Sequence, residues 1–304
     1  MINNCSVIIP TYFPGKIIEN LLKSIPPVKE ILVLDNSNDK ELEDLIKNNH
    51  KGVKYISTGD IGLGKTFNRA LNEINTGLMF ITQPDVVLEK NCIENLILAH
   101  KKYKNSALLV PLIYENNQYS NYDHFDLRLD KNKKIKNFKI KNFKNIHPSG
   151  DFGVEAVNST AILIDKKIIK EIGGWDEYYY TYLEDIDLCY KVRKNNFEIL
   201  KIKNSIVNHT GFQSHKLSKH NEINKSRIFN FNKSSLYFDY KNKSKLFFFS
   251  KCLKNLSKIF IKLIVNIILF RKKKININLI KLKSYYYFFF LENFGKKNIQ
   301  LIKK

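Results

Sequence analysis

Cysteines are few in this sequence of 304 residues, and no two of them are close together. Cys5, Cys92, Cys189 and Cys252 show no Cys-x-x-Cys spacing. This excludes a thiolate zinc site and a disulfide-dense scaffold, and it favours a reducing compartment. The 12 glycines and 7 prolines are too few for a collagen-like or linker-rich chain.

Acidic residues are almost absent from the last third of the chain. Residues 1–100 carry 10 lysines and arginines against 12 acids, residues 101–200 carry 17 against 14, and residues 201–304 carry 24 against 3. The formal net charge of +22 therefore belongs to a basic C-terminal appendage on a nearly neutral body. We expect no nucleic-acid partner, because the cations avoid the rest of the chain and no nucleic-acid motif is present.

Long apolar runs are missing too. The charge-free stretches near the end, Leu263–Phe270 and Ser284–Leu291, are far shorter than the ~20 residues that span a bilayer. The N-terminus lacks the basic and apolar segments of a secretory signal. We therefore expect a cytoplasmic protein without a spanning helix.

Short apolar runs alternate with amphipathic stretches over the first 112 residues. Strands are predicted at Ser6–Pro10, Glu30–Leu34, Val53–Ser57, Leu78–Thr82 and Ala107–Leu112, and helices at Lys16–Ile25, Lys40–Asn49, Thr66–Ile74 and Lys90–Tyr103. This alternation predicts an α/β fold with a mostly parallel sheet flanked by helices. Ligands of such sheets bind beyond the carboxyl ends of the strands.

Residues 113–155 interrupt the alternation. They are polar and contain the near-repeat Lys134–Ile146, which fits either a solvated loop or a flap over a bound acceptor. Further elements are predicted at Ala156–Asp165 (strand), Lys166–Ile172 (helix), Tyr182–Lys194 (helix), Glu198–Ile202 and Ser205–Asn208 (strands). Thr181 and Glu184 have the spacing of a capping box for the second helix.

The chain changes character from Lys241 onward. Its last 64 residues carry 17 cations and one acid, Glu292. A helix predicted at Lys245–Phe270 places four lysines on one face and apolar residues over much of the rest, and the aromatic run Tyr285–Phe290 follows it. This pattern is typical of a segment that lies in the interface of an anionic membrane. The alternative is a helix that packs on the protein's own core with its lysines outward.

The segment Gly59–Thr66 matches the P-loop pattern G-x-x-x-x-G-K-[ST] and lies between a predicted strand and helix. In a P-loop, backbone N–H groups and the lysine hold phosphate oxygens. Here the segment follows the third strand instead of the first, and no convincing catalytic set accompanies it. A P-loop NTPase or kinase is thus the alternative function.

Acidic residues also follow predicted strands. Asp35 follows one strand directly, Asp85 comes shortly after another, and Glu184 with Asp185 lies near the start of a helix. His209 follows the last predicted strand. Each of these alone fits a turn, a helix cap or a structural histidine, but carboxylates at the ends of two strands of one sheet outline a site.

Several segments together resemble family 2 glycosyltransferases, and most of all the rhamnosyltransferase-like group of bacterial surface polysaccharide biosynthesis. In chain order they are SVIIPTY (Ser6–Tyr12), LVLDNSND (Leu32–Asp39), DIGLGKTFNRAL (Asp60–Leu71), TQPDVVLE (Thr82–Glu89), GGWDEYYYTYLEDIDLCYKVRKNNFEI (Gly173–Ile199) and IVNHTGFQS (Ile206–Ser214). The resemblance covers about residues 5–240 and implies a GT-A fold. It also assigns the glycine-rich segment to the family pattern N-x-G-x-G-x-x-x-N-x-A, with Asp60 where Asn is usual, which makes the P-loop match accidental.

The resemblance implies a role for each candidate residue. Residues expected to bind the nucleotide sugar are Pro10, Thr11, Tyr12, Asp35, Asn68 and Asp85. Asp85 and His209 would hold Mn²⁺ or Mg²⁺ on the diphosphate, although Gln83 replaces the first acid of the D-x-D element. Asp185 would be the general base, and Trp175 and Glu184 would contact the acceptor.

The sequence thus predicts an inverting, metal-dependent glycosyltransferase in residues 1–240. Residues 1–112 would bind the nucleotide sugar, and residues 113–240 would bind the acceptor and carry the catalytic residue. The donor would be dTDP-rhamnose or a UDP-sugar, and the acceptor a lipid-linked or core glycan. Residues 241–304 would associate with the anionic inner face of the cell membrane.

Overall fold

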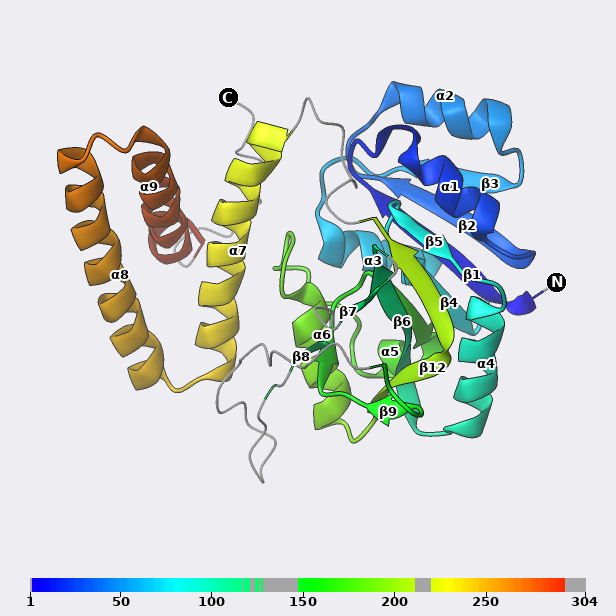
Figure 1. Cartoon of the computed structure of the whole chain (residues 1–304). Helices are drawn as coiled ribbons and strands as arrows, with labels where there is room; N and C mark the ends of the chain where they lie inside the picture. The colour runs from blue at the N-terminus through cyan, green and yellow to red at the C-terminus, as the bar shows by residue number, and fades with distance from the viewer. Residues whose placement is uncertain are drawn as a thin grey trace. The chain divides into compact units, whose positions relative to one another are not determined.

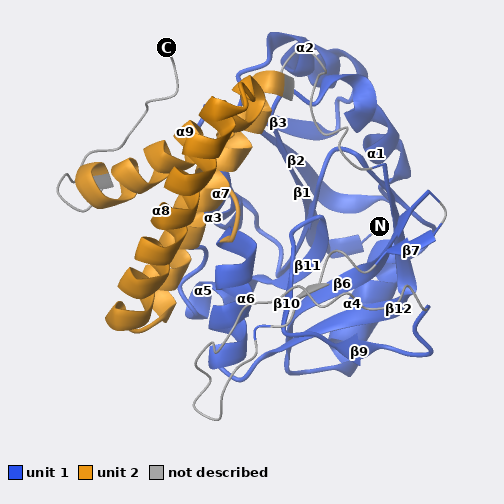
Figure 2. Ribbon diagram, turned by 60° about the vertical axis from the view of Figure 1, so that its left-hand side comes forward, with its two compact units in different colours: residues 1–180, 184–219 blue, residues 181–183, 220–304 orange. Residues whose placement is uncertain are grey.

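The computed structural model describes residues 2–116, 118–120, 124–125, 127, 147–210 and 220–292. The near-repeat at Lys134–Ile146, which the sequence predicts to be a loop or a flap, lies outside these residues, as does the end of the tail after residue 292. The chain divides into two compact units, residues 1–180 with 184–219 and residues 181–183 with 220–304 (Figure 2). The second unit thus includes a helix that precedes Lys241.

The first unit is built on one large mixed sheet (Figure 1). Its strands run in the order β3-β2-β1-β4-β11-β6-β12-β5. Their bounds are β1 (Ile2–Thr11), β2 (Val28–Asp35), β3 (Val53–Ser57), β4 (Leu78–Thr82), β5 (Val86–Leu88), β6 (Ser106–Glu115), β11 (Ala161–Asp165) and β12 (Glu198–His209). Shorter strands are β7 (Gln118–Ser120), β8 (His124–Phe125), β9 (Phe152–Gly153) and β10 (Ala156–Val157).

Most strands of this sheet point the same way. β3, β2, β1 and β4 pair in parallel, and β12 pairs in parallel with β6. β11 is antiparallel to both β4 and β6, so it reverses the direction once and leaves β6 aligned with β4. The sheet is therefore mostly parallel, as the alternation of the sequence predicts.

Helices pack on the sheet as the sequence pattern requires. The bounds are α1 (Ile18–Ser24), preceded by the 3-10 turn η1 (Gly15–Ile17), α2 (Lys40–Asn49), α3 (Leu63–Glu73), α4 (Cys92–Lys102), α5 (Lys166–Glu171) and α6 (Glu184–Lys194). The apolar faces of α1, α2 and α4 share one buried core with alternate residues of β1, namely Cys5, Val7 and Ile9. Because side chains of a strand alternate between faces, the other residues of β1 point to the face that α3 contacts.

Three features differ from the sequence prediction. The strand predicted at Ala156–Asp165 is split into β10 and β11 by the turn Asn158–Thr160, and β12 is one continuous strand with an irregularity between Ile202 and Ile206. The predicted capping box is wrong, because Tyr182 and Leu183 both have positive φ and α6 begins only at Glu184. Thr181 therefore lies outside the helix that it was expected to cap.

The second unit contains long helices joined by short turns: α7 (His220–Asn242), α8 (Lys245–Ile268) and α9 (Lys272–Tyr286), followed by the π-helical turn η3 (Tyr287–Glu292). Its core consists of one side of each element, with Leu236 from α7, Phe248 and Cys252 from α8, Tyr285 from α9 and Phe288 from η3. The aromatic run is thus partly an internal packing element. Among the described residues, no helix is long and apolar enough to cross a membrane.

Candidate active site

Polar residues gather at one edge of the sheet. Because β1, β2, β4, β6 and β12 point the same way, their carboxyl ends share this edge. Thr11 pairs with Asp35 at the ends of β1 and β2. Asp85 follows β4, and Glu115 and His209 end β6 and β12. The residues that the sequence places after separate strands therefore lie along one side of the fold, where such sheets bind ligands.

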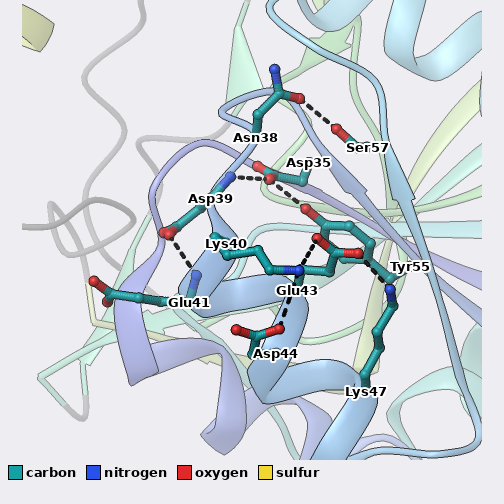
Figure 3. A network of polar contacts seen from close by, with 10 residues as sticks. All are labelled: Asp35, Asn38, Asp39, Lys40, Glu41, Glu43, Asp44, Lys47, Tyr55 and Ser57. Carbon is teal, nitrogen blue, oxygen red and sulfur yellow. Dashed lines mark hydrogen bonds and ion pairs between the residues drawn. The ribbon is translucent and has the colours of Figure 1, made fainter.

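Asp35 is fully buried at the centre of a hydrogen-bond network (Figure 3). Its Oδ1 accepts bonds from the backbone N–H and the hydroxyl of Ser37, at 2.9 and 2.5 Å. Its Oδ2 accepts bonds from the Asp39 N–H at 2.7 Å and the Tyr55 hydroxyl at 2.8 Å. Burial and this carboxylate both raise the pKa of Tyr55, which stays a donor. Asp35 thus fixes the loop after β2, and a bond to a nucleotide base would add to contacts that it already makes.

The end of β1 is bonded to the same loop. The Thr11 carbonyl accepts a bond from the Asn36 N–H at 2.9 Å, and the Phe13 N–H donates to the Ser37 hydroxyl at 2.9 Å. Pro10 and Thr11 are buried, and Tyr12 is partly exposed. The structure therefore brings these three residues beside Asp35, and their contact with a nucleotide stays a prediction.

The glycine-rich segment does not form a phosphate cradle. The backbone N–H of Leu63, at the start of α3, donates to the Tyr180 carbonyl at 2.6 Å and is not available to a phosphate. Gly62 has a φ of +83°, and a Cβ there would lie 2.6 Å from that same carbonyl. A Cβ on Gly64 would lie 2.9 Å from the Asp176 carbonyl. The glycines thus allow the loop after β11 and α5 to approach α3 closely, and the P-loop hypothesis finds no support.

Asn68 joins α3 to the Gly-Gly-Trp loop. Its Oδ1 accepts a bond from the Trp175 N–H at 2.9 Å, and its Nδ2 donates to the Trp175 carbonyl and to Glu177, both at 3.0 Å. Trp175 is only 3% exposed, and its ring packs against Phe67 with the centroids 5.1 Å apart. In this conformation, the Asn68 amide holds a loop and the indole is part of the core. Their predicted contacts with donor and acceptor remain untested.

Asp85 and His209 meet at the sheet edge. The Asp85 Oδ2 lies 3.4 Å from the His209 Nε2, and the other ring nitrogen, Nδ1, lies 3.1 Å from the Glu115 Oε1. Burial opposes protonation of His209, but the two carboxylates outweigh it and raise its pKa. Glu115 was missed by the sequence analysis, since a single acid at the end of an apolar strand carries no motif.

The acidic pair at the start of α6 is strongly perturbed. Burial raises the pKa of Asp185 to about 6, although the backbone N–H groups of Ile186 (2.7 Å) and Ser159 (3.2 Å) favour the carboxylate. Burial and the neighbouring Asp185 raise the pKa of Glu184 well above its usual range. Perturbed carboxyl groups of this kind are common at catalytic sites.

The turn Asn158–Thr160 connects the two parts of the site. Ser159 donates its N–H to Asp185, and the next residue, Thr160, accepts a bond at its carbonyl from the Gln83 N–H at 3.0 Å. Gln83 begins the turn that carries Asp85. The base candidate and the turn that bears the diphosphate candidate are therefore both bonded to one short backbone segment.

The donor atoms of Asp85 and His209 suit a divalent cation. Within the described parts of the chain, no three or more His, Cys, Asp or Glu side chains are arranged as a metal site. One carboxylate and one imidazole nevertheless lie side by side, and these ligand types suit Mn²⁺, or Mg²⁺ through the carboxylate. The pair fits a cation whose remaining ligands are supplied by a diphosphate.

A mostly parallel sheet with helices on both faces, and polar residues along its carboxyl edge, is the architecture of a GT-A fold. The crystal structure of GalNAc-T7 with UDP, GalNAc and Mn²⁺ has this fold and matches with a TM-score of 0.52 and 17% identity, over 68% of this chain. The match spans 43% of that longer chain. At this identity the likeness concerns the fold alone.

The model of glycosyl transferase family 2 matches residues 6–165, which is more than half of the chain. The chain therefore belongs to glycosyl transferase family 2. It is 25% identical to the low-salt glycan biosynthesis hexosyltransferase Agl10 of Haloferax volcanii over 227 residues, 70% of this chain and 71% of that protein. It is 22% identical to the N-acetylglucosaminyl-diphospho-decaprenol L-rhamnosyltransferase of Mycobacterium tuberculosis over 230 residues, 67% and 75% of the two chains.

Proposed function

We propose that this family 2 enzyme moves a sugar from a nucleoside diphosphate donor to a hydroxyl group of a lipid-linked or core glycan, with inversion at the anomeric carbon. The two relatives support this, since one is named for glycan biosynthesis and the other for rhamnosyl transfer to a diphospho-decaprenol acceptor. The donor is dTDP-rhamnose or a UDP-sugar. The product belongs to a bacterial surface polysaccharide.

Asp185 is the general base. Its carboxylate takes the proton of the acceptor hydroxyl while that oxygen forms a bond to the anomeric carbon. The bond from this carbon to the diphosphate breaks on the opposite face, and the nucleoside diphosphate leaves with the electron pair. The assignment is carried by the pKa of Asp185. Burial raises this pKa to about 6, although two backbone N–H donors favour the carboxylate. A base with a pKa near the working pH is suited to proton transfer.

The donor lies along the ends of β1 and β2 and reaches Asp85. Pro10, Thr11, Tyr12 and the loop that Asp35 organises bind the nucleoside, and Asn68 contributes to binding of the nucleotide sugar. Asp85 and His209 would hold Mn²⁺ or Mg²⁺, which supplies positive charge to the leaving diphosphate. Glu115 contacts the far nitrogen of His209 and keeps the ring directed at Asp85.

The acceptor enters on the side of α6. Glu184, whose pKa is raised well above its usual range by burial and by Asp185, contacts the acceptor beside Asp185. Trp175 borders the same region through the loop that Asn68 holds. In this arrangement, residues 1–112 serve the donor and residues 113–240 serve the acceptor. Residues 241–304 keep the enzyme on the anionic inner face of the cell membrane, where lipid-linked acceptors are found.

A panel of nucleotides tests the donor site. Thermal unfolding is measured with UDP, dTDP, GDP, CMP and ATP, each with and without Mn²⁺. We expect one nucleoside diphosphate to raise the midpoint, more so with metal, because a ligand at 100 times its Kd stabilises by about 2.7 kcal/mol. Asp85→Asn should remove the metal enhancement, whereas Asp44→Asn, on the exposed side of α2, should keep it. A response to ATP alone would contradict the proposal.

A further inference from the structure

Helix α8 carries an apolar stripe that no described residue covers. The stripe, called here the α8 outer stripe, consists of six residues that are 49–83% exposed: Leu246, Phe249, Leu253, Phe260, Ile264 and Ile268. Their spacing of three, four or seven residues places them on one face of the helix. The other side of α8 holds Phe248, Cys252 and Ile259, which are buried in the core of the second unit. Exposed apolar surfaces of this extent mark interaction sites.

A row of lysines lies along the stripe. Lys251, Lys254, Lys258 and Lys262 follow the same helical repeat, rotated away from the apolar side chains. Lys251 pairs with Asp239. Residues 245–286, which span α8 and α9, contain 11 lysines and arginines and no acid. The surface beside the stripe is therefore strongly positive.

The chemistry of this surface selects its partner. A second copy of the chain would bring two such cationic units together, and their charges would repel. An anionic bilayer offers hydrocarbon for the stripe and phosphate groups for the lysines. α8 is about 36 Å long at 1.5 Å per residue, and no described helix is apolar enough to cross a membrane. A helix with these properties lies in the plane of the interface.

We propose that α8 lies flat on an anionic lipid surface, with the outer stripe inserted among the acyl chains and the lysine row on the lipid phosphates. The proposal rests on the proposed function, because that function requires the enzyme to be at a membrane. It assigns the membrane contact to one face of α8. The buried members of the aromatic run do not make this contact. Tyr285 and Phe288 are buried, and the ring of Phe288 packs 5.8 Å from that of Phe248, so these side chains hold the helices together.

Vesicle flotation with the full-length protein tests the assignment. The probes are vesicles of phosphatidylcholine alone and of phosphatidylcholine with about 30% anionic phosphatidylglycerol. We expect binding to the anionic vesicles only. Leu253→Asn with Ile264→Asn should weaken it at least tenfold, since burying one such side chain is worth about 1.5–3 kcal/mol. Leu98→Asn, an equally exposed leucine on α4, is the matched control and should bind as the parent does.

Charge is tested separately. Lys254→Gln with Lys258→Gln should weaken binding to anionic vesicles roughly thirtyfold, because each cation near such a surface is worth about 1 kcal/mol. Both lysines have exposed positions on α8, so thermal unfolding of this variant should match the parent. Unchanged vesicle binding of both double variants would overturn the proposal.

Two rival contacts have their own outcomes. Tyr286→Ser with Phe290→Ser changes the exposed members of the aromatic run, and loss of binding in this variant alone would move the contact there. A dimer in light scattering that the stripe variant dissociates, without vesicle binding by the parent, would assign the stripe to a second copy.

Transfer of sugar to a soluble acceptor separates the two proposals. Vesicle binding without any turnover by the parent defeats the proposed function alone. Turnover without stripe-dependent vesicle binding defeats this inference alone.

Discussion

Replacement of Asp185 by asparagine should abolish transfer and at the same time stabilise the protein at alkaline pH. The side chain keeps its size, but it can neither ionise nor accept a proton. The turnover number should fall at least about 100-fold, as expected for the loss of a general base. Donor affinity should stay within about twofold, because none of the described contacts of Asp185 involves the donor-side loop of Asp35.

The size of the stability change follows from the pKa of Asp185. Burial raises it from 3.8 to about 6, a difference of about 2 units or ~3 kcal/mol. Because the folded pKa lies above the unfolded one, this carboxyl contributes stability below about pH 4 and loses it as the pH rises through about 6. The amide of the Asp185→Asn variant would accept only one of the two N–H bonds that the carboxylate accepts, which costs about 1 kcal/mol. The net gain at about pH 8 is therefore ~2 kcal/mol.

The assay is denaturant unfolding of both proteins between about pH 4 and about pH 8. The stability of the variant relative to the parent should increase by roughly 2.5 kcal/mol over this range. Glu171→Gln, at the exposed end of α5, is the control and should show no such trend. The turnover of the parent should rise with pH through about 6. A stability difference that does not change with pH, or a variant that retains turnover, would refute the reasoning.

Three further substitutions probe the rest of the site. Gly62→Ala should lower stability by about 2 kcal/mol or more, because the φ of Gly62 is +83° and a Cβ there would meet a carbonyl at 2.6 Å. Gly52→Ala is the control: a Cβ at Gly52 meets nothing within 4 Å, so the melting midpoint should not change. Asn68→Ala loses two bonds to the Trp175 backbone and should cost about 2–3 kcal/mol; an unchanged melting midpoint would contradict the role of Asn68 as a bridge. His209→Ala should weaken Mn²⁺ binding by about tenfold or more in calorimetry with the nucleoside diphosphate present, and equal affinity would remove His209 from the metal site.

The parts of the fold that could be predicted are the elements whose apolar side chains follow one clear repeat, either that of a helix or that of a strand. β3, β4 and α2 begin and end where the sequence places them, because the two strands are short runs of strand-forming residues between turns and α2 has an aspartate cap, Asp39, bonded to its first turn. The shared edge formed by the carboxyl ends of the parallel strands, β2 and β4 among them, then follows from topology. Asp35 and Asp85 were found for that reason.

The parts that could not be predicted depend on backbone geometry. Nothing in the composition of Ala156–Asp165 shows that Asn158–Thr160 turns and gives its Ser159 N–H to Asp185. Leu183 has a φ of +67°, which is uncommon for a leucine, and it moves the start of α6 away from the expected cap. Such features arise from contacts between distant segments, and local propensity does not encode them.

The sequence also left two alternatives open for the tail: a helix that lies in a membrane interface, or a helix that packs on the protein's own core. The helical repeat of α8 has two apolar sides, and the sequence does not say which one faces the protein. Phe248 and Cys252 turn inward, whereas Leu253 and Ile264 remain exposed. One side of α8 therefore packs on the protein's own core, and the other side leaves an apolar surface exposed.

The short segment that precedes α6, residues 181–183, belongs to the second unit. The Thr181 carbonyl accepts a bond from the Ser234 hydroxyl on α7 at 2.9 Å. Tyr182 and Leu183 follow in the left-handed region, a conformation that costs roughly 1–2 kcal/mol per residue and persists only where other contacts hold it. Asp185 comes two residues later. A hydrogen bond within the second unit thus helps to hold the strained backbone of residues 181–183 in place.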